Sequence, residues 1–497
     1  MESVRERITI RDKDQFEIKY TYPLQLDQEY TEYVVETFIF LPANLQINSK
    51  TYEKEKFYRD STAYIRFKTP AFMLPDIVSG EDSPLEKTRD AILRLIEDRM
   101  NPSIVENYDY RFRMFCSILK SALRDEIERI GNIREPDHRN SEATLMTDSL
   151  AALHEKFHLL RDITGFNTLD HDKKTLFNFS DEYIGIISEY YLFKLLEMLD
   201  GGRQAGLPEN EELRRKIIEE IRVGNAYRFS AGYPTIVREN STNETFIYRM
   251  RMLKKIMGSI LYIRTQNIDD GKWAEKFAIN VAAGLAMAIA TIVLLGAQAF
   301  RQDGLAWWVV LTAVVAYIIR ERMKESSRSF FVDWVRSHYY DYKTILRDDL
   351  DRKIGESKSF MGFLKKSKVP EKIRAARDKD QISALLENGS DEEVIYAKKR
   401  IKIRNKNCQT IWSDFKVDGI NDIVRYNMSH FMRVMSQPER HLFILDGDNW
   451  KTVEGTGVYH LNMILRYGMG EKSAIHKFRL IMNRNGIERI IEVPVKQ

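Results

Sequence analysis

Two long runs without charge interrupt a chain that otherwise mixes short apolar stretches with charged residues. Residues 277–300 (FAINVAAGLAMAIATIVLLGAQAF) and 304–319 (GLAWWVVLTAVVAYII) contain no Asp, Glu, Lys or Arg. At about 1.5 Å per residue, the first run would form a helix of about 36 Å, enough to cross a bilayer core of about 30 Å. The second would be shorter, at about 24 Å, and would rely on flanking arginines that reach the interface. The pattern predicts a transmembrane hairpin over residues 272–324.

Basic and aromatic residues around these runs indicate an orientation for the predicted transmembrane hairpin. Lysines and arginines lie before the first run and after the second, whereas the turn 301–303 holds one Arg and one Asp. The positive-inside rule then places both termini in the cytoplasm, and Trp and Tyr are expected at the two membrane interfaces. The expected interface residues are Trp273, Lys276, Trp307, Trp308, Tyr317, Arg320, Arg322 and Lys324. We therefore predict an integral membrane protein with the plan of bacterial inner-membrane proteins that carry cytoplasmic domains.

The first apolar run carries small residues at helical spacing, which let helices approach closely. These residues are Ala282, Gly284, Ala286, Ala288 and Ala290. One interpretation is that they pack the two helices of the hairpin together. The other is that they join copies of the chain, in which case the hairpin would form an oligomeric pore or a membrane-disrupting effector.

The region before the predicted hairpin changes from a strand pattern to a helix pattern. Residues 1–83 are expected to be β-rich, because 16–22 and 30–41 are dense in aromatic and β-branched residues. Residues 84–264 carry apolar residues at steps of three and four, which predicts a helical cytoplasmic region. We therefore expect a β-then-helical N-terminal unit.

The region after the predicted hairpin is expected to begin with helices and end with strands. Residues 325–440 are expected to form a helical stalk and a basic linker, with the linker at 355–370 and a further helix at 419–435. Residues 441–497 read as an antiparallel β meander, with Asn485-Gly486 at a hairpin turn. The predicted fold class is α+β.

Composition excludes several classes of protein. The 497 residues are 43% hydrophobic and 30% charged, which excludes a disordered or low-complexity chain and predicts at least two folded units. Lys+Arg 77 against Asp+Glu 73 is too balanced for a dedicated nucleic-acid binder. Cys116 and Cys408 lie far apart in the sequence, which argues against a disulfide framework. The mean hydropathy of −0.41 averages a polar chain with the two apolar runs.

One motif could carry chemistry. Residues 154–158 read HEKFH, and an H-E-x-x-H sequence on a helix places two imidazoles one turn apart to bind zinc. On this interpretation His154 and His158 are ligands and Glu155 deprotonates a metal-bound water. The third ligand would come from Glu182 or Glu189, on the next apolar helix, or from His171.

The same helix also has a structural interpretation. Leu150, Leu153, Phe157 and Leu160 form an apolar stripe that the two histidines border, and Lys156 adds a positive charge between those histidines. The chain holds no Rossmann fingerprint, nucleophile elbow or kinase signature. A boundary role for the histidines is therefore the simpler interpretation.

These patterns together favour a non-enzymatic membrane protein whose cytoplasmic domains bind a cytosolic partner or ligand and localise or relay it to the membrane. The alternatives are a membrane-anchored zinc hydrolase and the oligomeric pore. Zinc is the one cofactor considered, and no other is expected. The expected partners are the lipid bilayer and either another protein or a second copy of the chain; nucleic acid is not expected.

Overall fold

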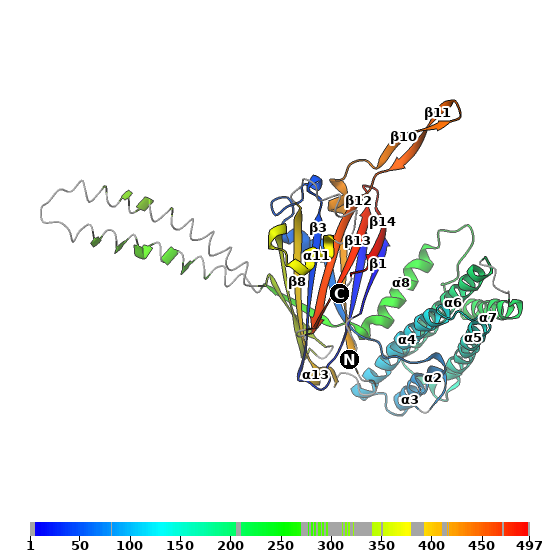
Figure 1. The fold of residues 1–497 in the computed structure, drawn as a ribbon. Helices are drawn as coiled ribbons and strands as arrows, with labels where there is room; N and C mark the ends of the chain where they lie inside the picture. The colour runs from blue at the N-terminus through cyan, green and yellow to red at the C-terminus, as the bar shows by residue number, and fades with distance from the viewer. Residues whose placement is uncertain are drawn as a thin grey trace. The chain divides into compact units, whose positions relative to one another are not determined.

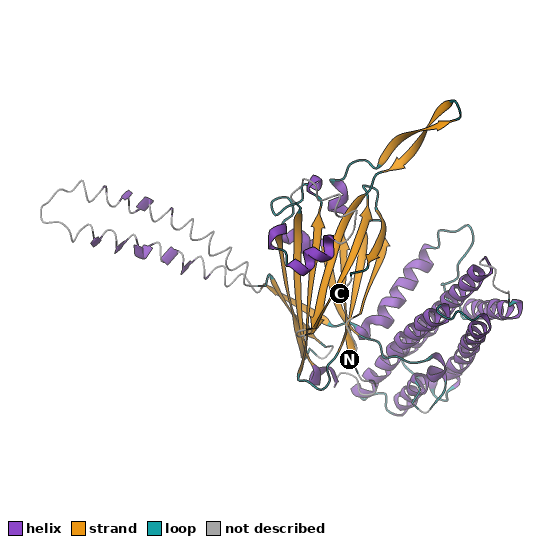
Figure 2. Cartoon of the chain, viewed as in Figure 1, coloured by secondary structure: helices purple, strands orange, loops and turns teal. Residues whose placement is uncertain are grey.

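The chain folds into two compact units in this computed structural model. The structure describes residues 5–80, 82–204, 210–269, 340–348, 351–378, 392–409, 415, 417–469 and 472–495, with isolated positions between 277 and 322. Residues 67–262 form one unit, here the helical unit. Residues 1–66 and 263–497 together form the other, here the β unit. The helical unit is therefore an insertion in the β unit, and the expected α+β class is confirmed (Figure 2).

The described strands of the β unit form two large antiparallel sheets and a separate two-stranded ribbon (Figure 1). The eight-stranded sheet has the order β14-β13-β12-β3-β8-β7-β6-β5, and the four-stranded sheet has the order β1-β2-β9-β4. The strands are β1 Arg5–Asp12, β2 Gln15–Pro23, β3 Tyr30–Leu41, β4 Ser61–Phe67, β5 Arg264–Asp269, β6 Tyr342–Arg347, β7 Lys353–Lys365, β8 Glu393–Arg404, β9 Gly419–Asn427, β10 Glu439–Asp446, β11 Asn449–Thr456, β12 Tyr459–Met469, β13 Lys472–Met482 and β14 Ile487–Val493.

The two large sheets approach each other at both edges. The backbone N–H of Ile263, beside β5, donates to the carbonyl of Ile65 on β4 at 3.1 Å. At the other edge, the N–H of Ile487 on β14 donates to the carbonyl of Lys13 in the β1–β2 turn at 2.6 Å. The β unit is thus a flattened barrel whose inner faces enclose side chains from both sheets.

Alternation along the strands sets which side chains face the interior. On β2, Phe16, Ile18, Tyr20 and Tyr22 are buried at every second position. The second half of β3 is buried on both faces, because a helix covers Phe38 and Phe40 on the outer face. The short helices of the β unit are η1 Ala43–Leu45, α1 Lys54–Asp60, η5 Lys366–Lys368, α11 Glu371–Asp378, which provides that cover, α13 Asn405–Gln409 and α14 Ser429–Arg433.

The helical unit contains long amphipathic helices that begin at clear sequence signals. The Ser83 hydroxyl accepts from the N–H of Glu86 and the Asn210 side chain accepts from that of Leu213, which caps two helices. Aromatic contacts fill its core: the rings of Phe157 and Phe177 are stacked at 5.2 Å. The helices are α2 Leu74–Val78, α3 Pro84–Glu97, α4 Pro102–Gly131, α5 Pro136–His158, η2 Leu159–Asp162, η3 Phe166–Thr168, α6 His171–Gln204, α7 Glu211–Ser230, α8 Glu244–Gly258 and η4 Ser259–Leu261.

The structure contradicts the prediction of an integral membrane protein with both termini in the cytoplasm. Among the described residues, no helix combines the length and apolar character needed to cross a bilayer. The long helices α4, α5, α6 and α7 all carry charged side chains, so none offers the charge-free stretch on which the prediction was based.

Most of the predicted hairpin lies outside the described residues. Of the expected packing set Ala282, Gly284, Ala286, Ala288 and Ala290, only Gly284 and Ala288 are described, as isolated positions. Of the expected interface set Trp273, Lys276, Trp307, Trp308, Tyr317, Arg320, Arg322 and Lys324, only Tyr317 and Arg322 are. The predictions of a membrane anchor, of a relay to the membrane and of an oligomeric pore are therefore withdrawn.

Two predicted segments in the C-terminal half are also corrected. The expected linker at 355–370 is largely strand β7, and the expected helix at 419–435 is strand β9 followed by the short α14. β9 is buried along most of its length, so its apolar residues do not alternate and periodicity does not separate it from a helix. Within the expected meander, β11 has no strand signal of its own, because NWKTVEGT is polar and exposed.

Candidate ligand-binding cavity

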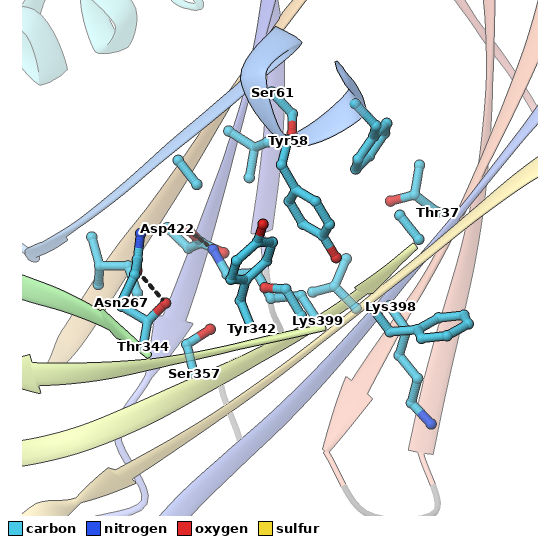
Figure 3. Close-up of a pocket in the computed structure, with 18 of the residues that line it drawn as sticks. Thr37, Tyr58, Ser61, Asn267, Tyr342, Thr344, Ser357, Lys398, Lys399 and Asp422 are labelled. Atoms are coloured by element: carbon cyan, nitrogen blue, oxygen red, sulfur yellow. Dashed lines mark hydrogen bonds and ion pairs between the residues drawn. The ribbon is translucent and has the colours of Figure 1, made fainter. Parts of the chain in front are cut away.

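A cavity of about 450 Å³ lies between the two large sheets of the β unit (Figure 3). Strands β3, β5, β6, β7 and β8 of the eight-stranded sheet form one wall. Strands β2, β4 and β9 of the four-stranded sheet, with helix α1, form the other. The volume falls in the range of about 300–1,000 Å³ that is typical of small-molecule sites.

Polar side chains occupy inward positions on three neighbouring strands of the first wall. Asn267 on β5 is in register with Thr344 on β6, and Thr344 is in register with Ser357 on β7. The Thr344 hydroxyl donates to Oδ1 of Asn267 at 2.8 Å. The interior of a closed sheet is normally filled by apolar side chains. Asn267 is exposed and Thr344 is half-buried, whereas Ser357 is only 2% exposed, so Ser357 is the member of the row that core packing does not explain.

The next row across the same wall brings a charge into the cavity. Tyr342, Ser359 and Lys399 are neighbours on β6, β7 and β8. The Lys399 ammonium lies 2.6 Å from Oδ1 of Asp422, which reaches in from β9 of the opposite sheet (Figure 3). The Asp422 side chain is 0% exposed and that of Lys399 is 18% exposed. The pair links the two walls of the cavity.

Oδ2 of Asp422 and Oγ of Ser357 are buried in the lining and have no hydrogen-bond partner among the described residues. A buried acceptor left without a donor costs about 1–3 kcal/mol, and more when it is charged. A donor that enters the cavity would remove that cost at Asp422.

Aromatic residues form part of the cavity lining. The rings of Tyr58 on α1 and Tyr342 on β6 meet edge to face, with centroids 4.7 Å apart. The Tyr58 hydroxyl donates to Oδ2 of Asp341 at 2.8 Å. Burial, reinforced by the Asp341 charge, raises the pKa of Tyr58 well above its ordinary value. Tyr58 therefore stays a neutral, fixed aromatic wall.

Tyr426, on β9, adds a second neutral aromatic group to the lining. Burial raises its pKa to about 12, although a hydrogen bond with Thr37 acts in the opposite direction. The lining thus offers hydroxyls, an amide, aromatic faces and one compensated ion pair. It also includes two cations, Arg59, which is exposed, and Lys398, whose ammonium points away from the other labelled side chains (Figure 3). This combination suits a neutral polar molecule better than a highly charged one.

The histidines of the HEKFH segment lie in the helical unit and have separate partners. In His154, Nδ1 lies 3.0 Å from Oε1 of Glu220 and Nε2 lies 3.0 Å from Oγ of Ser188. In His158, Nε2 lies 3.4 Å from Oδ1 of Asp181. Both nitrogens of His154 therefore have protein partners in this structure.

The carboxylates proposed to complete a zinc site also bind other groups. Glu155 is exposed. Glu182 forms an ion pair with Arg249 at 2.8 Å, and Glu189 forms one with Arg228. No cluster of three or more His, Cys, Asp or Glu side chains suited to a metal ion occurs in the described parts of the chain. The structure thus distributes His154, Glu155, His158, Glu182 and Glu189 over different contacts and does not bring them together as one site.

Sequence reasoning missed the cavity because most of its lining lies on strands β5 to β9, which were not predicted as strands. Lys399 belongs to the basic segment KKRIKIR of β8, which reads as a solvated surface. In the structure, successive side chains of this strand instead point to opposite faces of the sheet. Lys399 faces the cavity, whereas Arg400 forms an ion pair with Glu32 at 2.6 Å on the other face. The available signal was a set of Ser, Thr and Asn residues at every second strand position.

Comparisons with protein-family models, with curated proteins and with solved structures found no match for this chain. The geometry of the cavity is therefore the basis for a functional assignment.

Proposed function

We propose that the β unit binds a small neutral ring compound that carries hydroxyl or N–H groups, in the cavity between its two sheets. The observation that carries this proposal is the polar lining: Asn267, Thr344 and Ser357 form a row across one wall of the cavity, exposed at Asn267 and buried at Ser357. Across the cavity, Asp422 keeps one buried oxygen without a partner among the described residues.

The charges of the cavity define the class of ligand. Lys399 already compensates Asp422, so the pair adds no net charge for an ionic ligand to neutralise. The other cations of the lining are Arg59, which is exposed, and Lys398, which directs its ammonium away from the polar row (Figure 3). Asp422 can still accept a hydrogen bond from a ligand hydroxyl or N–H group. Tyr58 and Tyr342 add aromatic rings to the lining of the cavity, which favours a ligand with a flat or weakly polar face. Monosaccharides and nucleosides share this chemistry.

The test is a binding screen on the purified full-length chain. Thermal shift followed by calorimetry against a panel of neutral monosaccharides and a panel of nucleosides would identify the ligand class. We expect one panel to contain compounds that stabilise the protein and bind with a 1:1 stoichiometry. If no compound in either panel binds, the proposed ligand class is wrong.

Ser357→Ala separates a binding role of this hydroxyl from a structural one. The hydroxyl has no hydrogen-bond partner among the described residues, so its removal should leave the stability of the β unit equal or slightly higher. Affinity for the ligand should fall by about fivefold to tenfold if the ligand makes one hydrogen bond there. Glu32→Gln, on the other face of the same sheet, is the matched control and should leave affinity unchanged.

Ser357→Leu provides the complementary test. The larger apolar side chain would occupy part of the cavity of about 450 Å³, so it should abolish binding while the circular-dichroism spectrum stays unchanged. Unaltered affinity in Ser357→Leu would contradict a ligand at this position.

A further inference from the structure

A two-stranded ribbon extends from the two large sheets of the β unit (Figure 1). Strand β10 pairs with β11 from Glu439–Thr456 at the base to Asp446–Asn449 at the tip. The two-residue turn has Gly447 at φ +65, whereas Asp448 is not among the residues with positive φ. Glycine at the first turn position with a positive φ is typical of a type II′ hairpin. The register of this hairpin is therefore well defined.

The ribbon exposes large apolar side chains on both of its faces. Phe443 is 71% exposed and Leu445 is 84% exposed, and Trp450 on β11 is 67% exposed. Leu442 and Ile444 are exposed on the opposite face. A two-stranded ribbon is marginally stable by itself, and an apolar edge strand without a neighbour is a template for another strand. Among the described residues, no third strand pairs with β10.

The register identifies which backbone groups of β10 lie on its free edge. In a hairpin closed by a two-residue turn, the residues that flank the turn form a hydrogen-bonded pair, and such pairs alternate along the strands. Asp446, Ile444, Leu442 and Arg440 therefore direct their N–H and C=O groups to β11. Leu445, Phe443 and His441 direct theirs to the free edge.

We infer that the occupant of this edge is β10 of a second copy of the chain, paired antiparallel about a two-fold axis at Phe443. Phe443 directs its backbone groups outward, so two copies can exchange both hydrogen bonds there. In this register Arg440 lies opposite Asp446 of the partner subunit, because each is three residues from Phe443. The two-fold axis makes this ion pair twice.

Self-complementarity favours a second copy over another partner and β10 over β11. The same register places Leu442 opposite Ile444 of the partner subunit, and both lie on the same face as the ion pairs. On β11 the opposite charges are Lys451 and Glu454, which have no residue midway between them. Pairing of β11 with β11 of a second copy about a two-fold axis through one residue therefore does not place Lys451 opposite Glu454 of the partner subunit. The inferred product is a four-stranded sheet made from two ribbons.

Charge reversal with rescue is the first test, with sedimentation velocity of the full chain over a concentration series as the measurement. We expect a dimer, and we expect Arg440→Glu or Asp446→Arg alone to raise its dissociation constant by about tenfold or more. The double variant Arg440→Glu/Asp446→Arg should return it to within about threefold of the original value, because both pairs re-form with reversed sign. The remaining difference reflects the ion pair of Asp446 with Lys451 in the same ribbon, at 3.1 Å, which the double variant does not restore. Glu454→Arg, on β11, is the matched control and should leave the dissociation constant unchanged.

Disulfide trapping is the second test and does not depend on charge. Residues in a hydrogen-bonded antiparallel pair have Cα atoms about 5.5 Å apart, which suits a disulfide. Phe443→Cys should therefore form a covalent dimer under mild oxidation, whereas Thr452→Cys, its neighbour on β11, should not. The native Cys116 and Cys408 are both buried, so the original chain measures the background of disulfide formation between chains. A chain that stays monomeric at all concentrations, or a double variant without rescue, would overturn the inference in favour of a different occupant.

Discussion

Lys399 and Asp422 form an ion pair with 2.6 Å between Nζ and Oδ1, and this contact joins the two large sheets of the β unit. Lys399 lies on β8 of the eight-stranded sheet, and Asp422 lies on β9 of the four-stranded sheet. Asp422 is fully buried. Because a buried charge without its partner is strongly unfavourable, each residue constrains what can replace the other.

The first prediction concerns this pair. Lys399→Met should lower the free energy of unfolding of the β unit by about 3 kcal/mol, because it leaves the Asp422 carboxylate buried and unpaired. The double variant Lys399→Met/Asp422→Leu should recover most of that loss. Hydrogen exchange measured by mass spectrometry on peptides from β9 reports the stability of the β unit separately from that of the helical unit.

Arg400→Met is the matched control for Lys399→Met. Arg400 is the next residue, lies on the other face of the sheet and forms its ion pair with Glu32 at the surface. Its loss should cost less than about 1 kcal/mol. Equal effects of the two substitutions would show that Lys399 is no more than a surface cation.

The second prediction concerns acid stability of the helical unit, where Asp181 lies almost completely buried on α6. Burial alone would raise the pKa of Asp181, but hydrogen bonds from His158 and two tyrosines outweigh it and hold that pKa below its ordinary value. A lowered pKa in the folded state stabilises the unit above the unfolded pKa of about 3.9. That contribution is lost as the pH falls through the folded pKa.

Asp181→Asn should therefore lower the stability of the helical unit at pH 7 by about 3 kcal/mol, and the difference from the original chain should shrink below about pH 4. Thermal melting followed by circular dichroism at 222 nm, from pH 7 to pH 3, measures this. Asp148→Asn, which removes an exposed partner of Lys216, should change stability by less than about 1 kcal/mol. A difference that stays constant with pH would contradict the role assigned to the Asp181 charge.

The third prediction concerns the HEKFH segment. His154 connects Glu220 of α7 and Ser188 of α6, so His154→Ala should lower the stability of the helical unit by about 1–2 kcal/mol. Zinc content, measured by elemental mass spectrometry of the purified protein, should be the same in His154→Ala and in the original chain. One zinc per chain that disappears in His154→Ala would instead establish a metal site.

The elements that the sequence predicted well are those with a strong local signal. Residues 30–41 were expected to be a strand from their aromatic and β-branched residues, and they form β3. The turn at Asn485-Gly486 was expected to join two strands, and it lies between β13 and β14. In both cases the local pattern agrees with the tertiary environment, so no long-range information was needed.

The cavity depends on long-range register, which local patterns do not contain. Asn267 and Thr344 are 77 positions apart in the sequence, and only the pairing of β5 with β6 brings them together. Asp422 fell in a segment expected to be helical, because β9 is buried along most of its length and lacks alternation. The insertion of the helical unit separates β4 from β5, which hid the fact that both belong to one barrel.

The fourth prediction concerns mild acid and the β unit. Burial, aided by the nearby positive charge of Lys56, lowers the pKa of His430 below its ordinary value of 6.5. Lys56 Nζ lies 2.7 Å from Nδ1 of His430, so the neutral imidazole accepts a hydrogen bond. Asp60 acts in the opposite direction and Arg433 in the same direction as Lys56. The folded protein therefore takes up a proton at His430 less readily than the unfolded chain does.

The sign of the pH effect follows from this difference. Below about pH 6.5 the unfolded state binds more protons at this residue than the folded state, so the stability of the β unit should fall as the pH is lowered from 7 to 5. His430→Gln cannot bind that proton and should show a flatter pH dependence over the same range. Hydrogen exchange on peptides from α14 and β9, corrected for the intrinsic exchange rate at each pH, would measure it. A parallel pH dependence in the two proteins would show that another group is responsible.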